Sequence, residues 1–214
     1  MLYYTIRILG TQKKLLSVIP EKSCLPVFLS LGKINIMKTL VNTTLCYIEK
    51  DGCYLMLHRT KKQNDYNHDK WIGIGGKFEN GESPEDCAIR EIREETGLVV
   101  EPANLEYCGI VTFVDKSEVT EEEDSAPITP PYYTEFMHLF RVRKFSGTLL
   151  TDCDEGDLEW VPIEKINDLP HWQADEIYLD FIAQNRPFFS IKAVYKNSKL
   201  IETYLFGKPY NHWK

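Results

Sequence analysis

One stretch of the chain, GKFENGESPEDCAIREIREETGL at residues 76–98, constrains the fold more than any other. It carries Glu91, Glu94 and Glu95 close together. At about 100° per residue, these three carboxylates would share roughly a quarter of a helix circumference. Like charges at i,i+3 and i,i+4 each destabilise an isolated helix by about 0.2–0.5 kcal/mol. A helix formed here therefore needs a chemical reason to keep them on one face.

The two ends of this helix are marked in the sequence. Ser83 is a good N-cap, Pro84 suits the first helical position, and Asp86 stands three residues after the cap. Gly97 supplies the left-handed residue at which helices commonly end. The pattern predicts a helix over about residues 84–96.

The remaining elements are mostly strands. We expect hairpins at Lys50-Asp51-Gly52 and at Lys196-Asn197-Ser198, because each turn separates two β-rich runs. Further strands are predicted at residues 105–114 and 134–145, a glycine-rich β run at 71–78, an acidic loop at 118–131, and a second helix at about 173–184. Strands with two helices and no repeated βαβ unit predict an α+β fold or an α/β/α sandwich.

Composition limits the class of protein. The chain has 214 residues, of which 43% are hydrophobic, and its formal charge is −7. This acidity argues against stable binding of a nucleic-acid backbone, and the chain has no apolar run long enough for a membrane span. Its six cysteines form no C-x-x-C pair, which favours a reduced, cytoplasmic setting. The oligomeric state cannot be derived from these features.

The first 36 residues differ from the rest, with five basic side chains and one acidic side chain. Three interpretations stay open: an extension that packs as an extra element, a disordered arm, or translated upstream sequence with the native start at Met37. We favour the third interpretation. The intact mass of the natively expressed protein tests it, and the presence of residues 1–36 would reject it.

A cluster of carboxylate oxygens is the ligand set that Mg²⁺ or Mn²⁺ selects, and these ions commonly bridge to substrate phosphates. The glutamate face therefore points to cleavage of a phosphoanhydride bond. A solvated charged face is the simpler explanation for a sequence such as EIREE alone. It is less convincing here, because a glycine-rich run and a well-capped helix accompany the glutamates.

The same window resembles the Nudix box, G-x5-E-x7-R-E-U-x-E-E-x-G-U with U aliphatic. All nine specified positions fit: Gly76, Glu82, Arg90, Glu91, Ile92, Glu94, Glu95, Gly97 and Leu98. The resemblance implies a Nudix-type α/β/α sandwich with a mixed central sheet over residues 37–214. It also implies that Glu91, Glu94 and Glu95 bind Mg²⁺, or Mn²⁺ in its place, near the Gly76 carbonyl. Arg90 would hold these glutamates by ion pairing.

The flanking stretches resemble bacterial 8-oxo-dGTP diphosphatases of the MutT/MutX type over about residues 39–206. This implies nucleotide-pool sanitation: hydrolysis of an oxidised purine nucleoside triphosphate to the monophosphate and pyrophosphate. Glu155 stands where relatives have a further glutamate, so Glu94 and Glu155 both stay open as the general base. The expected substrate-binding residues are Tyr66, Trp71, Lys77, Trp172 and Asp175. In the vertebrate relative that sanitises oxidised purines, an asparagine follows the tryptophan that corresponds to Trp71. Here Ile72 stands in that place.

Two alternatives stay open beside this reading. One is a Nudix hydrolase for a different substrate: an RNA 5′ end, a dinucleoside polyphosphate or a nucleotide sugar. The other is a catalytically silent Nudix domain that only senses a nucleotide. The intact glutamates argue against the silent domain, because such a domain has no need for a self-repelling face.

Overall fold

The structure is a computed structural model that describes residues 6–7, 17–18, 27–28, 40–62, 65–116 and 133–213. The chain divides into two units, Met1–Met37 and Lys38–Lys214. In the first unit, three short strands pair antiparallel: β1 (Ile6–Arg7), β2 (Ser17–Val18) and β3 (Val27–Phe28). Whether this unit belongs to the native protein stays a prediction. The predicted acidic loop at 118–131 lies outside the described residues.

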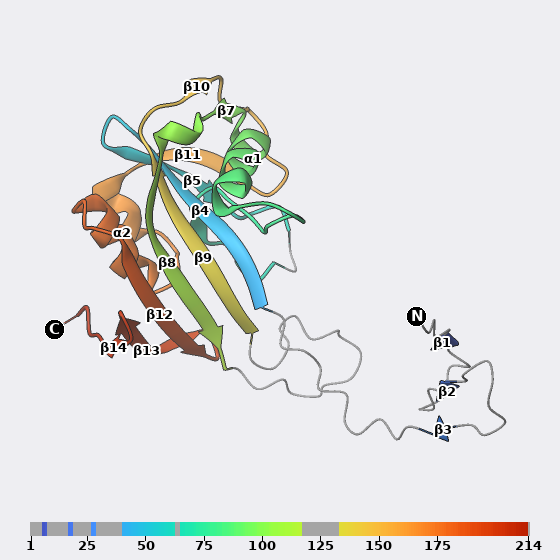
Figure 1. Ribbon diagram of the computed structural model, residues 1–214. Coiled ribbons are helices and arrows are strands. Elements are labelled where there is room, and N and C mark those ends of the chain that lie inside the picture. The colour runs from blue at the N-terminus through green and yellow to red at the C-terminus, as the bar shows by residue number, and fades with distance from the viewer. Residues whose placement is uncertain are drawn as a thin grey trace. The chain divides into compact units, whose positions relative to one another are not determined.

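The second unit is built on one large sheet (Figure 1). Its strands are β4 (Leu40–Lys50), β5 (Cys53–His58), β6 (Trp71–Ile72), β8 (Leu105–Asp115), β9 (Tyr133–Val142), β11 (Asp157–Pro162), β12 (Phe189–Lys196), β13 (Lys199–Leu205) and β14 (Lys208–Pro209). They are ordered β11-β5-β4-β9-β8-β12-β13-β14, and β6 pairs with β5. A separate pair joins β7 (Leu98–Val99) to β10 (Ser146–Gly147). The 3₁₀ helices are η1 (Pro102–Asn104) and η2 (Ile163–Asp168).

Both predicted hairpins are confirmed. The β4–β5 turn places Asp51 at φ 50° and Gly52 at φ 74°, and the β12–β13 turn places Asn197 and Ser198 at φ 51° and 59°. Two successive positive φ angles match the right-handed twist of the flanking strands. The connection between strands is therefore fixed locally in both places.

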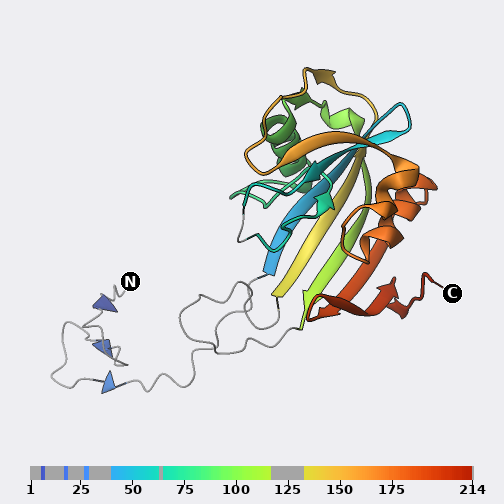
Figure 2. The same cartoon turned by 180° about the vertical axis from the view of Figure 1, so that it is seen from behind.

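The sheet is mixed, as predicted. The β4–β9 and β8–β12 pairs are parallel, whereas β4–β5 and β8–β9 are antiparallel. Helix α1 (Pro84–Thr96) and helix α2 (Asp175–Ala183) lie on opposite sides of the sheet (Figures 1 and 2). This arrangement is the predicted α/β/α sandwich.

Alternation along the central strands divides the core in two. On β4, Cys46 and Ile48 pack on the α1 side with Ala88 and Ile92, whereas Tyr47 packs on the α2 side. The outer layers are therefore held by alternate residues of the same strands. Neither helix in the described residues has the length and apolar character needed to cross a membrane.

The glycine-rich run departs from a continuous strand. Only Trp71 and Ile72 belong to a strand, and beyond them Ile74 and Lys77 make isolated bridges to Cys46 and Thr43 of β4. The segment thus crosses from β5 to β4 and then enters α1. The second helix begins two residues later than predicted, at Asp175.

Candidate functional site

Helix α1 is fixed at both ends by the predicted residues. The Ser83 hydroxyl accepts a hydrogen bond from the Asp86 N–H at 3.1 Å, and the Asp86 carboxylate accepts one from the Ser83 N–H at 3.0 Å. Gly97 adopts φ 73°, and its N–H donates to the Arg93 carbonyl. These caps set where the helix starts, and with it which residues face the sheet.

The three glutamates of α1 have different surroundings. Glu95 is buried with 7% exposure, Glu91 is half-buried, and the side chain of Glu94 is 62% exposed. Glu91 and Glu95 therefore lie against the sheet, whereas Glu94 lies at the solvent edge of the same face. The sequence alone did not reveal this division.

Arg90 joins the acidic residues around it. Its Nε and Nη2 atoms donate to both carboxylate oxygens of Glu82, at 2.7 and 2.9 Å. Its Nη1 atom donates to Glu91 at 2.7 Å and to Glu94 at 3.2 Å. The hydrogen bonds from Arg90 hold the pKa of Glu82 well below its ordinary value. Pairing with glutamates of α1 is what the Nudix-box resemblance implied for Arg90, the contact with Glu82 was not among the expected ones, and the role of Arg90 in the site stays a prediction.

Two glycines bring the backbone against these carboxylates. A Cβ on Gly76 would lie 2.6 Å from the carboxylate carbon of Glu91, so a side chain there would displace that group. The Gly75 N–H donates to Glu95 at 3.0 Å. Gly75 also has φ 154°, and a Cβ there would lie 2.7 Å from the carbonyl carbon of Thr44. The glycine-rich run thus permits the close backbone approach predicted for it.

The electrostatics of the glutamates are unfavourable without a cation. Burial is the main cause that raises the pKa of Glu95 to about 8; the Gly75 hydrogen bond opposes it, and the charges of Glu155 and Glu91 add to it. Burial also raises the pKa of Glu91, in spite of its contact with Arg90. A positive ion among these groups would relieve both costs.

Glu155 reaches the same region from the loop that precedes β11. It pairs with Arg59, which follows β5, and accepts a hydrogen bond from Lys62 Nζ at 2.7 Å. Arg59 also pairs with Asp65 at 2.6 Å. The neighbouring Gly156 is packed tightly, because a Cβ there would lie 2.8 Å from the carbonyl carbon of His58. This packing holds the Glu155 loop beside β5.

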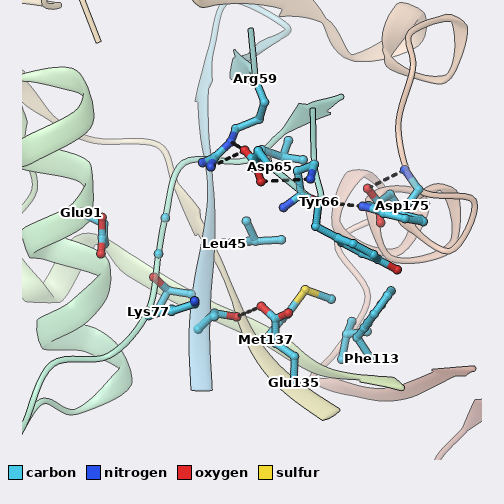
Figure 3. Close-up of a pocket in the computed structure, with 18 of the residues that line it drawn as sticks. Leu45, Arg59, Asp65, Tyr66, Lys77, Glu91, Phe113, Glu135, Met137 and Asp175 are labelled. Carbon is cyan, nitrogen blue, oxygen red and sulfur yellow. Dashed lines mark hydrogen bonds and ion pairs between the residues drawn. The ribbon is translucent and has the colours of Figure 1, made fainter. Parts of the chain in front are cut away.

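A cavity of about 720 Å³ joins these groups to a second cluster of predicted residues (Figure 3). The predicted site residues that line it are Tyr66, Gly76, Lys77, Arg90, Glu91, Glu95, Glu155, Trp172 and Asp175. Leu45 and Met137, near the centre of Figure 3, also line the cavity. One cavity therefore joins residues that are far apart in the sequence.

Two predicted residues lie elsewhere. Trp71 does not line the cavity; its ring is stacked on His58 at a centroid distance of 4.5 Å and packs against the core. Glu94 lines a separate shallow surface depression beside Arg90 and Arg93. Trp71 has this position because β6 pairs with β5, which places Trp71 in register with His58.

The far end of the cavity is aromatic. The rings of Tyr66 and Trp172 stack at 4.8 Å, and Trp172 Nε1 donates to Asn67 at 2.7 Å. Asp175, at the start of α2, is 6% exposed and accepts a hydrogen bond from the Trp172 N–H at 3.3 Å. Burial raises the pKa of Asp175 to about 7. Stacking surfaces beside a carboxyl group suit an aromatic ring that carries hydrogen-bonding groups.

Sequence reasoning missed several cavity-lining residues: Thr43, Arg59, Lys62, Asn67 and Glu135. The alternation along residues 134–145 could have indicated Glu135, because it places that residue on the same face as Met137 and Leu139. Nothing in the local sequence of Arg59 or Lys62 indicates a partner as distant as Glu155. Their roles follow from the β5–β11 pairing.

The donor set fits a hard divalent cation, because it combines the carboxylates of Glu91, Glu95 and Glu155 with the Gly76 carbonyl. In the described residues, no three such acidic, cysteine or histidine side chains are grouped closely enough to hold a metal ion. Cationic side chains occupy part of this space, since Arg90 contacts Glu91 while Arg59 and Lys62 contact Glu155. The oxygens are of the chemical type that Mg²⁺ binds, and in this structure the Glu91 and Glu155 carboxylates contact cationic side chains.

Comparison with known proteins identifies the family. The NUDIX domain model matches residues 39–182, and the chain belongs to the Nudix hydrolase family. An uncharacterized Nudix hydrolase of Bacillus subtilis, YvcI, is 30% identical over 150 residues, which cover 70% of this chain and 84% of that protein. The oxidized purine nucleoside triphosphate hydrolase of zebrafish (Danio rerio) is 31% identical over 127 residues, which cover 59% of this chain and 71% of that protein.

Solved structures agree on the fold. The MutT protein of Bacillus halodurans matches with a TM-score of 0.63 at 23% identity, covering 79% of this chain and 99% of that one. The predicted Nudix family and α/β/α sandwich are both confirmed, and the chain resembles MutT in architecture.

Proposed function

We propose that this protein is a Mg²⁺-dependent pyrophosphohydrolase that cleaves oxidised purine nucleoside triphosphates, such as 8-oxo-dGTP, to the nucleoside monophosphate and pyrophosphate. One observation carries the proposal: a single cavity has carboxylates from α1 and the Glu155 loop at one end and the Tyr66–Trp172 stack with Asp175 at the other. A purine nucleotide has matching chemistry, with phosphates at one end and a planar base at the other. The similarity to the zebrafish enzyme supports the same substrate class.

The phosphate end would work through charge. Glu91, Glu95, Glu155 and the Gly76 carbonyl would hold Mg²⁺, with Glu94 at their solvent edge. The bound ion would neutralise phosphate charge and lower the pKa of an attacking water. Arg59 and Lys62 would supply positive charge beside the phosphates, and either Glu155 or Glu94 would accept a proton from water.

The base end would select the purine. Tyr66 and Trp172 would stack on the base, Asp175 would hydrogen-bond its edge, and Lys77 would line the path between the two ends. The proposal assigns no substrate contact to Trp71, whose ring packs on His58. Nucleotide-pool sanitation in the cytoplasm would be the cellular role.

The test is Mg²⁺-dependent hydrolysis, with all phosphate-containing products separated and quantified by chromatography, over a panel: 8-oxo-dGTP, the normal deoxynucleoside triphosphates, a dinucleoside polyphosphate, a nucleotide sugar and a 5′-triphosphorylated RNA. We expect kcat/KM for 8-oxo-dGTP to exceed that for dGTP by 100-fold or more, about 2.7 kcal/mol of discrimination. Activity on another panel member alone would move the substrate to that class. Absence of all turnover would favour a nucleotide-sensing domain.

A further inference from the structure

The substrate cavity contains a carboxylate that the proposed reaction does not use. Glu135, on β9, lies in the cavity wall near Met137 (Figure 3). Its Oε1 atom accepts a hydrogen bond from the Thr43 hydroxyl at 2.7 Å, and its Oε2 atom accepts one from the Tyr133 hydroxyl at 2.9 Å. Both oxygens are therefore held in place by neutral donors.

This carboxylate has acceptor capacity to spare. Each oxygen of an ionised carboxylate has about two lone-pair sites, and a hydroxyl occupies one on each oxygen of Glu135. Within the part of the chain that the structure describes, no cation pairs with Glu135. Its negative charge would repel a polyphosphate. The group that it suits is a neutral hydrogen-bond donor.

Towards the phosphate end, Glu135 is connected through Thr43. That residue forms an isolated bridge with Lys77, which directly follows Gly76. Glu135 is thus one strand away from the backbone that contacts Glu91.

Towards the base end, Glu135 is connected through Tyr133. The Tyr133 ring contacts Phe113 at 6.3 Å, and Phe113 contacts both Tyr66 and Trp172, at 6.2 and 5.9 Å. Glu135 therefore stands between the two ends of the cavity. In a nucleotide, the sugar occupies that place.

We propose that Glu135 is a specificity-determining residue that accepts a hydrogen bond from a hydroxyl of the sugar. The proposal rests on the proposed function, because it places the phosphates and the base at the two ends named above. A hydroxyl is a neutral donor, and a site built to hydrogen-bond it discriminates against an analogue that lacks it, since the half-buried carboxylate then loses that hydrogen bond.

The experiment compares sugars at a fixed base. For the wild type, kcat/KM is measured with the ribonucleoside, 2′-deoxynucleoside and 2′,3′-dideoxynucleoside triphosphates. We expect kcat/KM to fall by 10-fold or more between the two substrates that differ in the recognised hydroxyl. The pair that shows this fall identifies the hydroxyl as 2′ or 3′. In Glu135→Met, which keeps the length of the side chain but lacks acceptors, this fall should shrink to within 2-fold. Glu79→Met, at an exposed glutamate on the cavity rim, is the matched control and should keep the fall.

Several results would overturn the proposal: a wild type with the same kcat/KM for the three sugars, a Glu135→Met variant that keeps the full fall in kcat/KM, or one that loses activity equally on all three.

A binding measurement separates this failure from failure of the proposed function. The dissociation constants of the ribo-, deoxy- and dideoxynucleoside 5′-monophosphates are measured for the wild type and Glu135→Met. If no triphosphate is hydrolysed, the proposed function fails. The role of Glu135 is then still decided by binding: Glu135→Met should lose the difference in affinity between the sugars that the wild type shows.

Discussion

The guanidinium of Arg90 contacts the carboxylate of Glu91 at 2.7 Å while two of its other nitrogens are held by Glu82. Glu91 is in turn pressed against the backbone of Gly76. The position of one carboxylate is thus set from two sides, by a planar cation and by a residue without a side chain. Both contacts can be removed separately.

Arg90→Lys should lower kcat/KM by about 10- to 100-fold, because an ammonium group cannot reproduce the fork of hydrogen bonds to Glu82 and Glu91. The measurement is steady-state hydrolysis of the best triphosphate, together with the melting temperature. Arg93→Lys, an exposed position on the same helix, is the control and should retain wild-type activity. Equal activity of both variants would show that Glu91 keeps its position without the guanidinium.

Gly76→Ala should raise the Mg²⁺ concentration for half-maximal activity by about 10-fold or more, since the new Cβ displaces Glu91. A Mg²⁺ titration of initial rates measures it. Gly81→Ala is the control. Its φ of 89° means that the substitution adds backbone strain, and its new Cβ meets nothing within 4 Å, so the site is not touched. An unchanged Mg²⁺ requirement in Gly76→Ala would remove Glu91 from the metal site.

Glu94→Gln should reduce turnover by at least about 100-fold. Because the Glu94 side chain is 62% exposed, the free energy of unfolding should change by no more than about 0.5 kcal/mol. Comparison with Glu155→Gln assigns the general base: the variant that lacks it loses the acidic limb of the pH–rate profile. If Glu94→Gln keeps the turnover of the wild type, Glu94 is not the general base and Glu155 is the remaining candidate for that role.

Asp175 should make stability depend on pH. Burial raises its pKa from an ordinary value of 3.8 to about 7. Between about pH 4 and pH 7 the folded protein therefore keeps a proton that the unfolded chain releases, so this contribution to stability falls as the pH rises. In Asp175→Asn this contribution is absent. The free energy of unfolding of the variant, relative to that of the wild type, should therefore rise by up to about 4 kcal/mol between pH 4 and pH 8.

Urea denaturation of both proteins across that range measures the effect. Asp180→Asn, on the same helix, is the control for replacing a carboxylate of α2 by an amide. A constant difference between Asp175→Asn and the wild type across this range would contradict the assigned cause.

Features set by neighbouring residues were predictable from the sequence. The caps at Ser83 and Gly97 and the turn at Asp51 and Gly52 depend on local backbone chemistry, and the structure has them where the sequence predicted. Local sequence did not indicate that one cavity contains both the α1 carboxylates and the aromatic residues. This arrangement depends on parallel pairing between β4 and β9, whose partners are far apart in the chain.

The exposure of individual site residues also depended on non-local packing. The spacing of Glu91, Glu94 and Glu95 gave their shared face, but only the contact with Gly75 and the sheet shows that Glu95 is buried and Glu94 is not. Trp71 has the aromatic character of a base-stacking residue, and the pairing of β6 with β5 takes it out of the cavity.

The parallel pairing of β12 with β8 has a consequence for synthesis of the protein. Ala193 and Tyr195 of β12 line the cavity, and Ala193 is in register with Phe113 of β8. A nascent chain that has completed β4, β9 and both helices still lacks this wall. A ligand of this cavity can stabilise only a domain in which the cavity is complete, so it offers no assistance to a chain that still lacks β12. Until β12 docks, the edge of β8 is open to wrong pairing, which exposes the chain to aggregation at this stage of its synthesis.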